Sequence, residues 1–327
     1  MESEIRNPKS AIGWLNRLGP LLGLMLVYGL FTLLAGESFT GVRNMETIAR
    51  QTAVVGTAAL GMTMVIIAGG IDLSVGSIIA LSTVVIATFL ARGVHPLLAA
   101  SAGIVTGLLC GLVNGFIITR LRVVPFIVTL GTLLAVRGIA KGLAHEQKVD
   151  APWTSLNDLL TTLPPDQRWM IVPPGVWIML ALAVVVAVML RYTRFGRHIF
   201  AIGSSEQTSR LSGIDVRRMK LMVYAGSAAF AGLAGLMQFS RLTVGDPTAA
   251  TGLELDVIAA VVIGGGSLSG GEGSVFGALI GALIMTVIRS GCSQMGLANW
   301  VQEIITGGII VVAVALDRLR HRRGILT

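Results

Sequence analysis

The sequence predicts an all-α, polytopic membrane protein with about ten transmembrane helices and both termini in the cytoplasm. Three observations carry this prediction: 54% of the residues are hydrophobic, only 13% are charged, and the apolar residues gather in long runs. Soluble domains contain roughly a quarter charged residues, so a soluble fold is excluded. At ~20 residues for each membrane-spanning helix, ten helices need about 200 residues, which is close to the apolar content of this chain.

Ten apolar segments follow one another, and each is expected to form a helix. The first follows a charged N-terminal stretch that lacks a small-residue cleavage site, so we expect it to remain as an uncleaved span. The segments cover about residues 20–35, 53–68, 74–91, 97–118, 124–142, 175–190, 221–239, 256–268, 274–290 and 299–316. Together they predict a single transmembrane domain, residues 1–327.

Glycine recurs in these segments at helical intervals. The two clearest rows are Gly103, Gly107, Gly111, Gly115 and, later in the chain, Gly277, Gly281. In lipid, small residues at this spacing let two helix backbones approach closely. We therefore expect both faces to pack against neighbouring helices.

Basic residues gather on one side when the N-terminus is placed inside and the chain crosses the membrane ten times. Sixteen of the 25 lysines and arginines then lie in inside segments. Cytoplasmic loops carry an excess of lysine and arginine, so this bias supports the orientation. It also accounts for the formal net charge of +8 without nucleic-acid binding.

Two longer polar segments interrupt the apolar pattern. One is a periplasmic loop at about 143–174, which contains tryptophan and proline and is expected to include a short amphipathic helix on the membrane surface. The other is a cytoplasmic loop at 191–220. The outer loop is a candidate cap or docking surface for a periplasmic partner.

The cytoplasmic loop contains the start and stop signals of a short helix. Ser204 and Gln207 fit a capping box, Glu206 lies where a helix N-terminus favours negative charge, and Gly213 is placed to end the helix. A helix of about two turns is too short to be stable alone. The segment is therefore either an ordinary interfacial loop or a docking helix for a cytoplasmic partner.

Two segments of the membrane domain resemble each other at an offset of 195 residues. In each, an apolar helix is interrupted by Gly-Gly, a polar residue and Leu-Ser before a new apolar helix begins. Paired interruptions of this kind point to a translocation pathway, because unwound backbone at membrane depth is tolerated only where protein or water covers it. The candidate pathway residues are Gly69, Gly70, Asp72 and Ser74 in the first copy and Gly264, Gly265, Ser267 and Ser269 in the second.

Asp72 is the most informative of these residues, because an unpaired carboxylate inside a bilayer is costly. Three alternatives remain open from the sequence. Asp72 faces a cavity in contact with solute, caps a helix N-terminus, or lies at the cytoplasmic end of its segment.

Motifs of enzymatic catalysis are absent. The chain has four lysines, none of which follows a glycine, so a Walker A loop is impossible. No nucleophile elbow or zinc-protease motif occurs, and the two cysteines and four histidines lack metal-ligand spacing. We therefore expect no catalytic residues, no metal site and no cofactor in this chain. If ATP drives transport, the ATPase must be a separate chain.

Several stretches together resemble a known family. They are GMTMVIIAGGIDLSVGSIIAL (61–81), RYTRFGRHIFAIGSSEQTSRLSGIDVRRMK (191–220), the stretch 246–284 and the run Pro174 to Leu180. On these motifs the chain is similar to the permease subunit of ribose-type monosaccharide importers of the ATP-binding-cassette (ABC) class. The pattern departs at Ser205, where many members carry Asn.

The resemblance implies a bacterial inner-membrane protein that works with other subunits. Those would be a cassette ATPase that binds ATP and Mg²⁺, a second permease copy or sister permease, and a periplasmic binding protein that delivers a ribose-like or xylose-like monosaccharide. The resemblance further implies that 204–214 is a coupling helix that inserts into a groove on the ATPase. The implied coupling residues are Ser204, Ser205, Glu206, Gln207, Arg210, Leu211, Gly213 and Ile214.

Two other classes of function are weighed against this one. An ion-coupled secondary transporter of a small polar solute would need carboxylates at mid-membrane, where the spans offer little beyond Asp72, Glu272 and the end-lying Asp256 and Glu303. A non-transporting scaffold or receptor would not need paired interrupted helices.

Overall fold

The computed structural model describes residues 8–164 and 169–324 and is helical almost throughout. The N-terminal half contains α1 (Pro8–Ala35), α2 (Glu37–Thr40), α3 (Val42–Ile67), α4 (Val75–Ala91), α5 (Pro96–Arg120) and α6 (Pro125–Leu143). The C-terminal half contains α7 (Pro174–Tyr192), α8 (Arg194–Ser204), α9 (Glu206–Leu211), α10 (Val216–Leu242), α11 (Leu253–Ile263), α12 (Val275–Gln294) and α13 (Asn299–Gly324).

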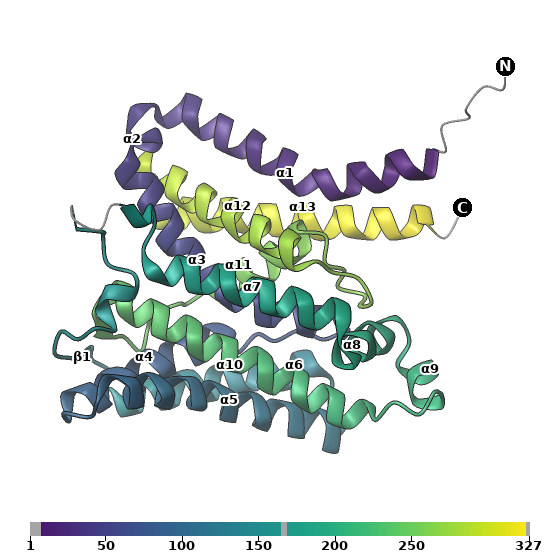
Figure 1. The fold of residues 1–327 in the computed structure, drawn as a ribbon, viewed down its shortest axis with the longest axis horizontal. Coiled ribbons are helices and arrows are strands. Elements are labelled where there is room, and N and C mark those ends of the chain that lie inside the picture. Colours follow the sequence, from purple (N-terminus) through teal and green to yellow (C-terminus); the bar gives the residue numbers. More distant parts are fainter. Residues whose placement is uncertain (1–7, 165–168, 325–327) are drawn as a thin grey trace.

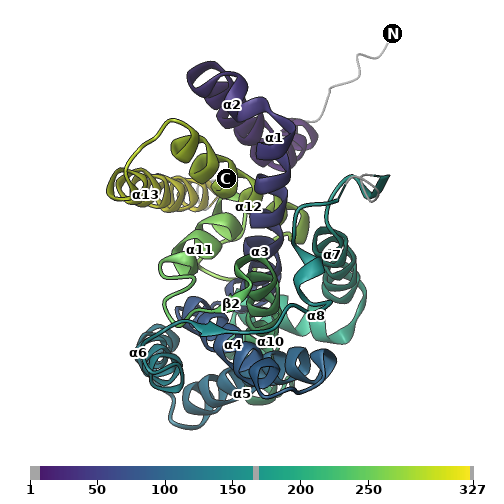
Figure 2. The same ribbon diagram turned by 90° about the vertical axis from the view of Figure 1, so that its left-hand side faces the viewer.

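Helix α3 forms the centre of the bundle. In Figure 2, α1, α11, α12 and α13 lie on one side of it, while α4, α5, α6 and α10 lie on the other. Every residue of α3 from Thr52 to Ile67 is buried. A helix of this length is about 39 Å long, which exceeds the ~30 Å hydrocarbon core of a bilayer.

Six of the described helices are long and apolar enough to cross a membrane: α3, α5, α6, α7, α10 and α12. Three shorter apolar stretches lie in α1, α4 and α13. The prediction of a polytopic helical membrane protein is confirmed. Each of the ten predicted apolar segments also overlaps a helix, although length and composition support six crossings and not ten.

The described ends of the chain lie at the same end of the bundle as α8 and α9, and the small β1–β2 sheet lies at the opposite end (Figure 1). In that sheet β1 (Val149–Asp150) pairs antiparallel with β2 (Val244–Gly245). The terminal residues 1–7 and 325–327 lie outside the described part of the chain.

Several helices differ in extent from the sequence prediction, and α3, α11 and α8 are the most informative cases. Helix α3 begins eleven residues before the predicted segment, because Asn44 and Ile48 are buried although their surroundings in the sequence are polar. Helix α11 ends at Ile263 and not at 268, because Gly265 takes a positive φ of 92° that stops the helix. Helix α8 was expected to be loop.

The expected amphipathic helix of the outer loop is wrong for the described part of 143–174. That part contains strand β1 and a three-residue 3-10 helix, η1 (Asn157–Leu159). Ser240 Oγ of α10 donates to the Asn157 carbonyl and accepts from the Leu160 amide, each at 2.8 Å. These bonds satisfy the Asn157 carbonyl and the Leu160 amide, one at each end of this turn of the loop. Residues 165–168 of this loop lie outside the described residues.

The glycine rows pack as predicted. A Cβ at Gly107 would lie 2.3 Å from the Ala228 carbonyl oxygen, and one at Gly111 would lie 2.3 Å from the Tyr224 carbonyl oxygen. A Cβ at Gly281 would lie 1.9 Å from the Ala260 oxygen. The α5–α10 and α11–α12 contacts are therefore close enough to require glycine at these positions.

Candidate functional site

The two interrupted segments end their first helices in the same way. After α3, the Gly69 amide donates to the Ile66 oxygen and the Gly70 amide to the Val65 oxygen, both at 2.9 Å. After α11, Gly265 and Gly266 make the equivalent bonds to Val262 and Val261, at 2.9 and 2.8 Å. This paired pattern with a left-handed glycine is a Schellman cap.

The structural match between the two breaks is shifted by one residue from the sequence match. The left-handed glycine is Gly69, with φ of 77°, in the first break and Gly265, with φ of 92°, in the second. The sequence offset pairs Gly69 with Gly264 instead. The second helices begin after Ser74 and Ser274, so Ser269 lies within the second break and not at the start of a helix.

Both breaks meet helix α8 at one junction. The Gly271 amide donates to the Ile67 carbonyl oxygen at 2.9 Å, which connects the second break to the end of α3. A Cβ at Gly203 of α8 would lie 1.7 Å from the same oxygen, and one at Gly270 would lie 2.9 Å from Gly69 Cα. Three separate segments therefore touch backbone to backbone. We call this contact the glycine junction.

Asp72 is fully buried in the first break. Its Oδ1 accepts hydrogen bonds from the Ser74 amide at 2.9 Å and the Ser74 hydroxyl at 2.6 Å, immediately before α4 begins. Asn114 of α5 donates to Ser74 Oγ at 2.9 Å. Of the alternatives open from the sequence, this geometry favours a structural role at the N-terminus of α4.

The polar cluster around Asp72 is not saturated. Within the described part of the chain, Asp72 Oδ2, Asn114 Oδ1 and the Tyr224 hydroxyl are buried and have no hydrogen-bond partner. The Tyr224 hydroxyl lies against Gly70, where a Cβ would approach it to 2.3 Å. A buried polar group without a partner costs free energy, so each of these atoms favours a further hydrogen bond.

The predicted pathway residues divide by exposure. Gly69, Gly265 and Ser269 are exposed on the single chain. Gly70, Asp72, Ser74, Gly264 and Ser267 are buried. The glycine junction brings Gly69 close to Gly270 of the second break.

Helix α9 is capped by Ser205, which corrects the prediction of Ser204. Ser204 is the last residue of α8, and its hydroxyl donates to the Phe200 carbonyl oxygen at 3.0 Å. Ser205 is extended, with φ of −162°, and its Oγ accepts from the Thr208 amide at 3.2 Å. A capping residue needs this non-helical backbone, which Ser204 does not have.

The end of α9 follows the prediction. Gly213 has a φ of 82°, and the Ile214 amide donates to the Ser209 carbonyl oxygen at 3.1 Å. The helix thus contains only Glu206–Leu211, shorter than two turns. Gln207 and Arg210 are exposed, while Ile214 is half-buried against the main core.

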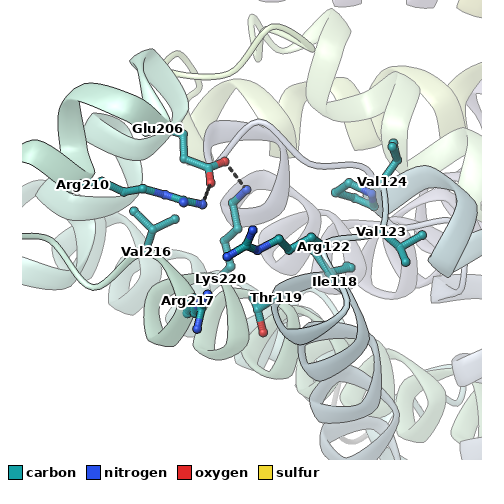
Figure 3. Close-up of a pocket in the computed structure, with 11 residues that line it drawn as sticks. Ile118, Thr119, Arg122, Val123, Val124, Glu206, Arg210, Val216, Arg217 and Lys220 are labelled. Carbon is teal, nitrogen blue, oxygen red and sulfur yellow. Dashed lines mark hydrogen bonds and ion pairs between the residues drawn. The ribbon is translucent and has the colours of Figure 1, made fainter.

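Glu206 holds α9 against α10. Its Oε2 lies 2.5 Å from Lys220 Nζ, and its Oε1 forms an ion pair with Arg210 (Figure 3). Burial acts to raise the pKa of Glu206, but the hydrogen bonds and charges of Lys220 and Arg210 outweigh it, so the pKa lies below its ordinary value. The α9 helix is therefore stabilised by a neighbouring helix, as a short helix requires.

Leu211 gives α9 an apolar tip. Its side chain is 83% exposed, although it lies among charged residues at the end of the bundle. A single exposed apolar side chain is common on protein surfaces and does not by itself mark an interface, so its exposure only makes Leu211 available for contact with a partner. The sequence prediction included Leu211 but could not establish its exposure.

Helix α8 is the element of the candidate site that the sequence interpretation missed. It begins at Thr193, whose hydroxyl accepts from the Gly196 amide at 3.2 Å, and it buries Ile199 and Ile202. The spacing of Phe195, Ile199 and Ile202 is helical and was a usable signal. The many arginines favoured a loop. Through Gly203, α8 joins α9 to both breaks.

These features define a class: a polytopic helical membrane protein with two glycine-capped breaks and an exposed short helix at one end. The chain belongs to the family described as the permease component of the branched-chain amino acid transport system, whose model matches residues 44–314. It is therefore a transport component and not an enzyme, and a multi-pass protein of the bacterial inner membrane.

Named relatives agree with the resemblance to ribose-type permeases, which is confirmed. The chain is 39% identical over 308 residues to the ribose import permease protein of Escherichia coli K12, covering 94% of this chain and 95% of that one. It is 39% identical to the ribose import permease protein of Bacillus subtilis, covering 94% of each. It is 32% identical to the L-arabinose ABC transporter permease of Azospirillum brasilense, covering 94% of this chain and 89% of that one. No solved structure matches the chain.

Proposed function

We propose that this chain is the membrane permease of an ATP-driven importer that moves a monosaccharide, ribose or a xylose-like pentose or a related sugar. The relatives named for ribose, L-arabinose and D-allose transport support a sugar as the solute. Residues 1–327 form the single permease domain. It crosses the inner membrane about ten times, with both termini and α9 in the cytoplasm and the 143–174 loop in the periplasm.

The observation that carries the proposal is the path from the surface to the breaks. Leu211 and Arg210 are exposed on α9. The preceding helix, α8, ends at Ser204, and its Gly203 lies in the glycine junction. A cassette ATPase that receives α9 in a groove would contact an element that touches both interrupted helices. ATP and Mg²⁺ belong to that subunit in this proposal.

The remaining partners have separate places. A periplasmic sugar-binding protein would dock on the end of the bundle that carries β1 and β2. There Arg137 of α6 donates to the Pro247 and Ala249 carbonyl oxygens and holds the 243–252 segment in place. A second permease copy or a sister permease would complete the pathway, which the exposure of Gly69 and Gly265 on one chain supports.

The test of docking uses Leu211→Asp. We expect the variant to insert in the membrane in normal amount and to lose most of its co-purification with a co-expressed cassette ATPase. Leu143→Asp is the matched control, because Leu143 is also an exposed leucine at a helix end, 55% exposed, but it ends α6 and lies outside α9. Co-purification of the ATPase with Leu211→Asp in the wild-type amount would contradict the docking of α9 on the ATPase.

Uptake into proteoliposomes distinguishes the transport classes. We expect accumulation of labelled pentose only when the ATPase, ATP and a loaded binding protein are present. Uptake driven by a proton or sodium gradient without ATP would instead favour the ion-coupled secondary transporter. The buried carboxylates Asp72 and Asp256 would then be the first to examine, although Asp256 already pairs with Arg289.

A further inference from the structure

A pocket of about 270 Å³ lies between the α5–α6 turn and the α9–α10 corner. Figure 3 shows it with Glu206 and Arg210 on one side, Lys220 at its centre and Val123 and Val124 on the other. The pocket is large enough for one small charged group, since a single water molecule needs only about 10–15 Å³ of such space.

The pocket carries an excess of positive charge. Its lining includes four basic side chains, Arg122, Arg210, Arg217 and Lys220, and one carboxylate, Glu206. Both oxygens of that carboxylate are already engaged by Arg210 and Lys220. Arg122 and Arg217 form no ion pair with any residue in the parts of the chain that the structure describes. Two guanidinium groups thus remain available for an anion.

The backbone of Arg122 is held in an unusual conformation. Its φ is 55°, in the left-handed region that residues with a Cβ rarely adopt. Glycine adopts this conformation without steric strain, yet the position carries a long basic side chain. Figure 3 shows that this side chain extends toward Lys220 and not away from the pocket.

The other wall of the pocket is apolar and continues onto the outer face of α5 and α6. Ile118 and Val124 line the pocket. Beside them Leu121, Phe126 and Ile127 are 63%, 47% and 59% exposed, as expected for side chains that face lipid tails. The pocket therefore lies at the boundary between the lipid-facing surface and the basic end of the bundle.

We propose that this pocket binds the phosphate group of an anionic phospholipid, with Arg122 and Arg217 as its principal ligands. Guanidinium groups pair with phosphate oxygens through two parallel hydrogen bonds. Basic pockets between membrane helices at the cytoplasmic side are suited to lipid headgroups. The adjoining apolar surface accepts the acyl chains, which a soluble phosphate does not have.

The test measures which lipid the purified full-length chain retains. The protein is incubated in detergent with equal amounts of phosphatidylglycerol and phosphatidylcholine, and bound lipid is counted by native mass spectrometry. We expect the wild type to retain phosphatidylglycerol in excess. Each arginine near an anionic lipid contributes about a factor of five, so R122Q/R217Q should reduce that retention about 25-fold.

The matched control is R120Q/R218Q. It removes the same two charges from the neighbouring residues, which lie outside the pocket and are exposed, and it should retain phosphatidylglycerol like the wild type. The single variant R217Q keeps Arg122 and its turn intact and should retain about fivefold less phosphatidylglycerol than the wild type. It replaces the double variant if that protein inserts poorly.

Three results would overturn the proposal. They are equal retention of the two lipids by the wild type, equal losses in R122Q/R217Q and R120Q/R218Q, and full displacement of phosphatidylglycerol by an equimolar amount of inorganic phosphate. The last result would assign the pocket to a free phosphate. Because the chain is tested without an ATPase, failure here is independent of the coupling role proposed for α9.

Discussion

Asn114 of α5 donates a hydrogen bond of 2.9 Å to Ser74 Oγ, forty residues earlier in the chain. Ser74 in turn donates to Asp72 Oδ1 at 2.6 Å. All three side chains are fully buried. The bond therefore fixes the first break against a helix that itself packs on α10.

We expect Asn114→Leu to lower the free energy of unfolding by about 1–3 kcal/mol, because Ser74 loses a donor in a buried site. The measurement is the thermal unfolding of the purified chain in detergent. Thr106→Ala on the same helix is the control, since its hydroxyl bonds only to the Ala102 carbonyl oxygen of its own helix. Equal melting temperatures for the two variants would contradict the structural role of Asn114.

Substitutions of Asp72 should separate its shape from its charge. Asp72→Asn keeps the Oδ1 acceptor for both Ser74 bonds, so we expect unfolding and sugar uptake close to wild type. Asp72→Ala leaves the Ser74 amide and hydroxyl without that acceptor and should destabilise the chain by about 1–3 kcal/mol. Complete loss of uptake in a well-folded Asp72→Asn protein would show instead that transport requires the charge.

The α5–α10 contact should not tolerate a methyl group at Gly111. A Cβ there would approach the Tyr224 carbonyl oxygen to 2.3 Å, so Gly111→Ala must push the helices apart. We expect a lower melting temperature and a cost of about 1–3 kcal/mol. Gly138→Ala is the matched control in α6, where a Cβ meets nothing within 4 Å, and it should be neutral or stabilise slightly through helix propensity.

The ion pairs of Glu206 should make the stability of the chain depend on pH. A carboxyl group with a folded pKa below the ordinary value of 4.5 stabilises the folded state above pH 4.5. This stabilisation is lost as the pH falls through the folded pKa. The pair is partly exposed, so we expect about 1 kcal/mol or less after solvent screening.

The measurement compares the wild type with Glu206→Gln at pH 7 and at about pH 3.5. The difference in melting temperature should be present at the higher pH and should shrink at the lower one. Glu37→Gln serves as the reference, because Glu37 forms no ion pair with the described residues. A difference that stays constant with pH would show that the contribution of Glu206 is not electrostatic.

The sequence predicted the helices well where apolar residues are continuous. It predicted them poorly where contacts with distant residues determine where a helix begins or ends. The glycine rows identified the α5–α10 and α11–α12 contacts, because spacing alone places their members on one face. The start of α3 could not be predicted, since burial of Asn44 depends on Ser290 of α12, which bonds to it at 2.7 Å. A contact between residues so distant in the chain leaves no local pattern.

The candidate site was predicted in part for the same reason. The composition of 204–214 was enough to place a short capped helix, and the repeated Gly-Gly was enough to place two breaks. The predictions of the capping residue and of the register between the two breaks were each wrong by one position, because both depend on backbone dihedral angles that the sequence does not show. The partnership of Glu206 with Lys220 could not be derived from sequence, because it depends on how α9 turns back on α10.

The glycine junction has a mechanical consequence. No side chain lies between Gly203, Ile67 and Gly271, so a shift of α8 cannot be absorbed by a change of rotamer. The hydrogen bond from Gly271 to Ile67 couples the two breaks to each other at the same place. A displacement of α8 at this contact would therefore act directly on the backbone of both halves of the internal repeat.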